Sequence, residues 1–189
     1  MSGAVSAGTL TALRSSRVLA VGTGLRIAVS PVIMALLLGH AWTIATVVFL
    51  AAAATDWFDG RLARRWGVTT RLGSFLDTTA DKLLVTSALV GLVAVHRASP
   101  WVALVIIGRE LILLGLRAAV SATGANFATS WLGKWKATVQ FVAVALAMIR
   151  PDVIIAGAYL DQWAMVVAAV ITAWSGADYV TRSLTVLRG

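Results

Sequence analysis

Long apolar stretches separated by short polar breaks are the feature that most restricts how this chain folds. Hydrophobic residues make up 59% of its 189 residues, and charged residues only 13%. A helix needs about 20 apolar residues to cross a bilayer, where the backbone must satisfy its own hydrogen bonds. Stretches near that length occur at about 18–39, 42–62, 73–96, 100–121, 133–149 and 153–177. The sequence therefore predicts an all-α integral membrane protein with six transmembrane helices.

The residues before the first stretch have a different pattern. Leu10 and Leu13 are apolar, whereas Arg14 and Arg17 are basic. This mixture is typical of a short helix that lies in the membrane interface. We expect an N-terminal interfacial helix within 1–17 and a single six-helix domain at 18–189.

The basic residues lie mainly on one side of the predicted layout. Those on the richer side are Arg14, Arg17, Arg61, Arg64, Arg65, Arg71, Arg117, Lys134, Lys136, Arg182 and Arg188. Arg97 and Arg150 fall on the other side. Because positive residues flank spans on the cytoplasmic side, both termini are predicted to be cytoplasmic in a bacterial inner membrane. The net charge of +8 then indicates contact with anionic membrane lipids and not with nucleic acid.

Four aspartates form half of all the acidic residues in the chain. Asp56 and Asp59 are three residues apart, and Asp77 and Asp81 are four apart, so each pair shares one face of a helix. Two such helices side by side would bring four carboxylates together, and these would repel one another without cations. Oxygen ligands favour Mg²⁺ or Mn²⁺, and a two-metal site suits phosphoryl transfer.

These aspartates also allow two other interpretations, a structural ion network and a divalent-cation transporter. Neighbouring bases could neutralise them in a structural ion network, although buried ion pairs are a poor source of stability compared with apolar packing. Intramembrane carboxylates also line the paths of divalent-cation transporters. A transporter predicts acids through the depth of the bilayer, whereas these four are confined near its cytoplasmic surface. The pattern favours catalysis.

The pattern Asp56-x2-Asp59-Gly60-x2-Ala63-Arg64-x8-Gly73-x3-Asp77-x3-Asp81 resembles the signature of the CDP-alcohol phosphotransferase family. The resemblance implies a six-helix membrane enzyme, commonly a homodimer. Such an enzyme transfers a phosphatidyl group from a CDP-lipid to an alcohol and releases CMP.

The resemblance also implies roles for individual residues. Asp56, Asp59 and Asp77 would hold two divalent metals, while Asp81 would contact metal and act as the catalytic base. The positions implied to bind the CDP-lipid are Asp56, Gly60, Ala63, Arg64, Thr70 and Gly73.

A second basic group lies downstream, at Arg109, Arg117, Lys134 and Lys136. Arg109 and Arg117 are eight residues apart, about two helical turns, and so share a face. Converging cations suit a phosphorylated acceptor, although Lys136 also fits as an ordinary flanking charge.

The region from Arg109 to Gln140 resembles the branch of the family that uses CDP-diacylglycerol and glycerol 3-phosphate. That branch usually has an Asn-x2-Thr-x2-Arg run in the first span, whereas here Ala20 precedes Thr23 and Arg26. The alternative acceptors are phosphatidylglycerol, giving cardiolipin, and inositol phosphate.

Overall fold

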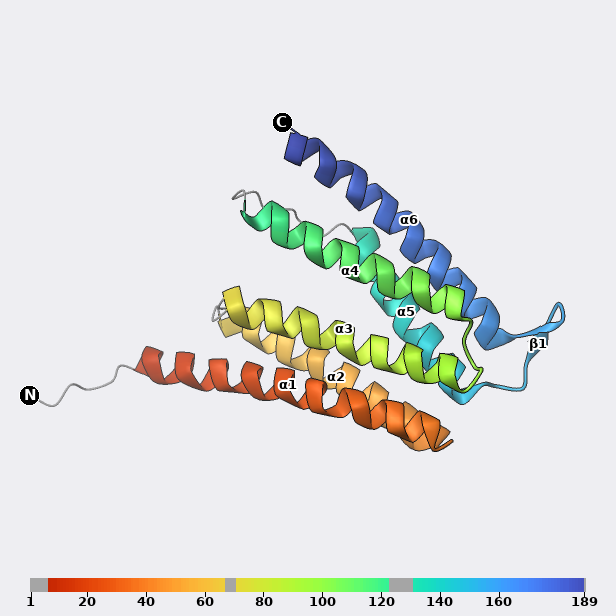
Figure 1. The fold of residues 1–189 in the computed structure, drawn as a ribbon. Coiled ribbons are helices and arrows are strands. Elements are labelled where there is room, and N and C mark those ends of the chain that lie inside the picture. Colours follow the sequence, from red (N-terminus) through yellow and green to blue (C-terminus); the bar gives the residue numbers. More distant parts are fainter. Residues whose placement is uncertain (1–6, 67–70, 123–130, 189) are drawn as a thin grey trace, which may run out of the picture. The chain divides into compact units, whose positions relative to one another are not determined.

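The computed structural model describes residues 7–66, 71–122 and 131–188, and the side chains of residues 22–55, 76–120 and 135–181. Helices dominate these ranges (Figure 1). Their bounds are α1 Ala7–Leu38, α2 Trp42–Trp66, α3 Arg71–Ala94, α4 Pro100–Ala122, α5 Trp131–Ile149 and α6 Leu160–Arg188. A short antiparallel hairpin, β1 Ile154–Ile155 and β2 Ala158–Tyr159, precedes α6. The predicted all-α fold with six helical segments is confirmed.

The start of the last helix differs from the prediction. The apolar stretch was expected to become helical near residue 153, but α6 begins at Leu160. Ile154 pairs with Tyr159, and the turn between the strands has positive φ at Ala156 (50°) and Gly157 (82°). Glycine adopts this conformation without steric cost. The chain therefore makes a tight turn where hydropathy alone indicated helix.

The N-terminal segment is continuous with the first helix. An interfacial helix was expected within residues 1–17, and its location in the interface stays a prediction. In the structure α1 runs unbroken from Ala7 to Leu38. No proline interrupts it before Pro31, so nothing in the local sequence forces an end near Arg17. Residues 7–17 are therefore the first turns of α1, and residues 1–6 lie outside the described part of the chain.

Two helices end in the same hydrogen-bonded motif. Beyond α1, His40 has a φ of 57°, and its amide bonds to the carbonyl of Leu37 while Ala41 bonds to Leu36. After α3, His96 has a φ of 56°, and its amide bonds to the carbonyl of Val93 while that of Arg97 bonds to Leu92. This is the Schellman motif, which usually has glycine at the left-handed position. The histidines thus terminate helices and allow short connections to the next helix.

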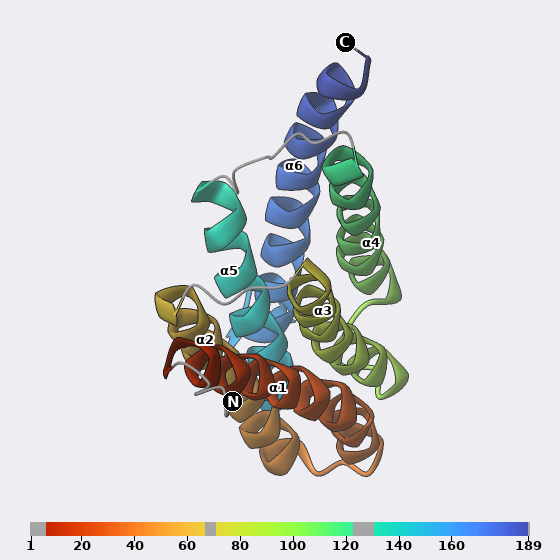
Figure 2. The same ribbon diagram turned by 90° about the vertical axis from the view of Figure 1, so that its left-hand side faces the viewer.

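The chain divides into two compact units, residues 1–88 and 89–189, with the boundary inside α3. In the first unit α1 packs along α2 (Figures 1 and 2). Ile33 and Leu37 of α1 and Phe49 of α2 are fully buried. In the second unit α6 packs against both α4 and α5 (Figure 2). Ile106 of α4 and Met148 of α5 are fully buried there.

Apolar residues also cover the outer faces of the helices. Within the described residues, Leu160–Thr181 is long and apolar enough to cross a membrane. Shorter apolar helical segments are Gly22–Leu38, Trp42–Thr55 and Trp135–Ile149. Large exposed side chains include Leu104 and Leu111 on α4 and Val170 on α6. Such extended apolar surface is unusual for a protein surrounded by water.

Candidate active site

The four predicted metal ligands lie on α2 and α3. Asp56 and Asp59 belong to the last turns of α2, but their side chains lie outside the described residues. Asp77 and Asp81 belong to α3, and their side chains are described. Of the predicted CDP-lipid contacts, the side chains at positions 60, 63, 64 and 73 are outside the description, and Thr70 lies outside it altogether.

Arg26 of α1 joins the two described aspartates. Its Nη2 donates a 2.8 Å hydrogen bond to Oδ1 of Asp77, and its Nη1 lies 3.9 Å from Oδ1 of Asp81. Thr23 donates a second hydrogen bond, of 3.3 Å, to the same oxygen of Asp77. The Arg26 side chain is only 3% exposed, whereas those of Asp77 and Asp81 are 29% and 38% exposed. The two carboxylates therefore converge on one buried cation and remain accessible to solvent.

This geometry fits divalent-metal binding as far as the described side chains extend. The spacing of four residues places Asp77 and Asp81 on one face of α3, as predicted. Their oxygen donors are those that Mg²⁺ and Mn²⁺ prefer. No cluster of three or more potential ligands occurs among the described side chains, which exclude Asp56 and Asp59. The complete four-carboxylate cluster remains a prediction.

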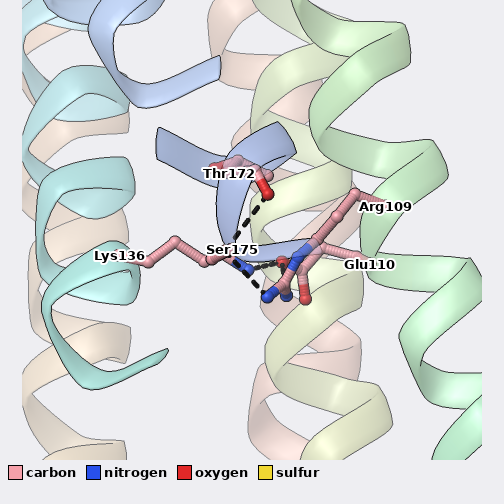
Figure 3. A network of polar contacts seen from close by, with 5 residues as sticks. All are labelled: Arg109, Glu110, Lys136, Thr172 and Ser175. Atoms are coloured by element: carbon pink, nitrogen blue, oxygen red, sulfur yellow. Dashed lines mark hydrogen bonds and ion pairs between the residues drawn. The ribbon is translucent and has the colours of Figure 1, made fainter. Parts of the chain in front are cut away.

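A second polar network links three helices in the second unit (Figure 3). Glu110 of α4 makes ion pairs with its neighbour Arg109, at 3.0 Å, and with Lys136 of α5. Arg109 also donates a 3.1 Å hydrogen bond to Oγ of Ser175 on α6. That hydroxyl donates in turn to the backbone carbonyl of Thr172, at 3.1 Å. All five residues of the network are wholly or mostly buried.

The network brings together two of the four predicted acceptor-binding residues. Arg109 and Lys136 share the carboxylate of Glu110, and their three charges sum to +1. Arg117, two turns further along α4, lies over the ring of Tyr179, with its guanidinium carbon 5.6 Å from the ring centre. The side chain of Lys134 lies outside the described residues. A positive excess on buried, hydrogen-bonded side chains is suited to binding an anion.

Several of these contacting residues were not identified as site residues from the sequence. Thr23 and Arg26 were noted only as part of a family motif, although their spacing of three residues indicates a shared helix face. Glu110 stood out only as an acid next to Arg109. Ser175 occurs in a stretch without any sequence signal for a site. Its relevance depends on which helix packs against Arg109.

A small cavity of about 310 Å³ lies beside the N-terminal end of α4. His96, Arg97 and Ser99 line it on one side and Gln162 on another. Burial lowers the pKa of Arg97 from its usual value, and the positive charge of Arg150 lowers it further. Arg109 does not line this cavity, so the cavity is separate from the network around Glu110.

The sequence of this chain is similar to those of several known proteins. A sequence model of the CDP-alcohol phosphatidyltransferase family matches residues 20–174. A Sodalis glossinidius protein named CDP-diacylglycerol–glycerol-3-phosphate 3-phosphatidyltransferase is 47% identical over 139 residues, covering 71% of this chain and 75% of that protein. Proteins of the same name from Shigella flexneri and Escherichia coli K12 are each 45% identical over 142 residues, covering 72% of this chain and 76% of theirs.

Proposed function

This chain belongs to the CDP-alcohol phosphatidyltransferase family and is an enzyme of that class, and from that premise we propose its specific reaction. It transfers a phosphatidyl group from CDP-diacylglycerol to glycerol 3-phosphate, giving phosphatidylglycerophosphate and CMP. The observation that carries this proposal is the 45–47% identity, over about three quarters of their length, to relatives named for that reaction. The network of Arg109 and Lys136 around Glu110 supports it, because the acceptor carries a phosphate.

The family generally depends on a divalent metal. In our proposal Asp56, Asp59, Asp77 and Asp81 would hold two ions, Mg²⁺ or Mn²⁺, which would supply positive charge to the pyrophosphate. The convergence of Asp77 and Asp81 on Arg26 supports their assignment to one site. Arg64 binds the CDP moiety together with Asp56, Gly60, Ala63 and Gly73 of the same signature and with the nearby Thr70.

Asp81 is the proposed catalytic base. A hydroxyl group is a poor nucleophile near neutral pH, so a positioned carboxylate has to accept its proton. The acceptor oxygen forms a bond to the phosphorus that carries diacylglycerol, and the bond from that phosphorus to the oxygen of CMP breaks. The hydroxyl proton goes to Asp81. The 38% exposure of the Asp81 side chain is consistent with access by a substrate.

Arg109, Arg117, Lys134 and Lys136 form the proposed acceptor site. The acceptor phosphate carries the negative charge that these cations attract, and a guanidinium can bind two phosphate oxygens at once. The contacts of Arg109 and Arg117 to Ser175 and Tyr179 of α6 support a site along the α4–α6 interface.

We further propose that the enzyme spans the bacterial inner membrane with six helices, with both termini and the active site cytoplasmic. The apolar helix Leu160–Thr181 and the exposed apolar side chains of α4 and α6 support this location. CDP-diacylglycerol is itself a membrane lipid, so an enzyme in the bilayer has direct access to it. A homodimer is expected from the family resemblance.

The proposal is tested with purified protein in detergent, CDP-diacylglycerol and Mg²⁺. Glycerol 3-phosphate, phosphatidylglycerol and inositol phosphate are added separately, and CMP release and the lipid product are followed. We expect CMP release with glycerol 3-phosphate and none with the Asp81→Asn variant, which should still bind CDP-diacylglycerol. If CMP is released with phosphatidylglycerol or inositol phosphate but not with glycerol 3-phosphate, the proposed acceptor is wrong. CMP release that persists in the Asp81→Asn variant would show that Asp81 is not the catalytic base.

A further inference from the structure

Helix α6 carries no residue of the family signature, yet it makes close contact with Arg109. Arg109 points from α4 toward α6, where its Nη2 donates to Oγ of Ser175 at 3.1 Å (Figure 3). Because Ser175 uses its hydroxyl hydrogen on the carbonyl of Thr172, its oxygen is oriented to accept from Arg109. The hydroxyl therefore has a fixed orientation at this contact.

Gly176 makes room for the stem of the same arginine. A methyl group at position 176 would lie 2.7 Å from Cγ of Arg109 and 3.5 Å from its Nε. Carbon atoms do not approach to 2.7 Å, and Cγ is near the base of the side chain, so Arg109 would have to change its rotamer. The present position of the guanidinium therefore requires glycine at position 176.

Glu110 holds the same guanidinium by a 3.0 Å ion pair and also binds Lys136. One donor of Arg109, Nε, is buried and has no hydrogen-bond partner among the described residues. The guanidinium is thus held in place by α4 and α6 and still has an unused donor. Fixed cations with spare donors bind phosphate with less loss of side-chain entropy than mobile ones.

We propose that Ser175 and Gly176 are positioning residues that orient Arg109 toward the phosphate of the acceptor. This inference rests on the proposed function, since it concerns the acceptor site of that reaction. It makes α6 a determinant of acceptor affinity, while the signature residues of α2 and α3 bind the CDP-lipid. Substitutions on α6 should consequently change the KM for glycerol 3-phosphate and leave the KM for CDP-diacylglycerol unchanged.

The main test compares Gly176→Ala with Gly115→Ala. Both glycines lie inside helices and both changes raise helix propensity, but an added methyl group at position 115 meets no atom within 4 Å. We expect Gly176→Ala to raise the KM for glycerol 3-phosphate roughly tenfold, the effect of losing one charge-assisted contact. Its kcat and its KM for CDP-diacylglycerol should stay within about twofold of those of Gly115→Ala.

Ser175→Ala provides a second test that introduces no steric clash. It removes the hydrogen bond to Arg109 and should raise the same KM by about fivefold to tenfold. Ser175→Thr keeps the hydroxyl and is expected to restore most of the affinity. This variant tests the proposal even if Gly176→Ala does not fold, which a melting temperature in detergent would reveal.

The outcomes separate this inference from the proposed function. If the unmodified enzyme releases no CMP with glycerol 3-phosphate, the proposed acceptor is wrong. If the unmodified enzyme uses glycerol 3-phosphate but Ser175→Ala and a folded Gly176→Ala leave its KM unchanged, the positioning role is wrong. Equal losses for both substrates would likewise overturn it, because they would indicate a general structural effect.

Discussion

Replacing Arg26 by methionine tests the link between α1 and the aspartates of α3. Methionine keeps an apolar stem of similar length and removes the guanidinium. The Arg26 side chain is 3% exposed and its 2.8 Å bond to Asp77 joins two charged groups. We therefore expect Arg26→Met to lower stability and to change the environment of Asp77.

The magnitude follows from the burial of the two partners. Breaking a fully buried ion pair costs about 3–5 kcal/mol, because the remaining charge is left without solvent. The Asp77 side chain is 29% exposed, so water can solvate its carboxylate after the change. A hydrogen bond to a charged group contributes about 1.5–3 kcal/mol, and we expect a loss of about 2 kcal/mol. For a chain of this size that corresponds to a fall in Tm of about 4–8 °C.

The assay is thermal unfolding in detergent at one scan rate, with a chelator present so that metal binding does not contribute. Ile27→Met, at an exposed neighbouring position, is the matched control and should leave the Tm unchanged. Asp77→Asn and the double variant complete a double-mutant cycle. The reasoning is refuted if the two substitutions are additive, since independent effects would mean that Arg26 and Asp77 do not interact.

Three further predictions concern the acceptor, the core and the metal. Arg117→Ala should raise the KM for glycerol 3-phosphate about tenfold without changing that for CDP-diacylglycerol, and an equal loss for both in initial-rate assays would show a structural role. Phe49→Ala, at a fully buried position, should lower stability by about 3–5 kcal/mol, whereas Leu50→Ala, at a 47% exposed position, should change the Tm in detergent much less. Removing divalent ions with a chelator should abolish CMP release, and Mg²⁺ or Mn²⁺ should restore it while Ca²⁺, with its larger and looser coordination, should not.

The sequence by itself determined the helical segments and the face of α3 that Asp77 and Asp81 share. An apolar run of helical length has to be helical wherever water is excluded, because only then does its backbone satisfy its own hydrogen bonds. The proximity of Asp77 and Asp81 follows from a spacing of four within one helix, which requires no tertiary information. Where a local turn competes with the apolar pattern, as at Ala156 and Gly157, the apolar pattern alone predicts a start of α6 that is too early.

Contacts between helices could be decided only by the tertiary structure. Arg26 and Asp77 are 51 residues apart, Lys136 and Glu110 are 26 apart, and Arg109 and Ser175 are 66 apart. Helical periodicity says which residues share a face, but it does not say which other helix packs on that face or at what height. Those choices depend on the packing of whole helices, in which each side chain contributes a small part of the energy. The contact of Arg109 with α6 is therefore a property of the fold, and no local sequence pattern indicates it.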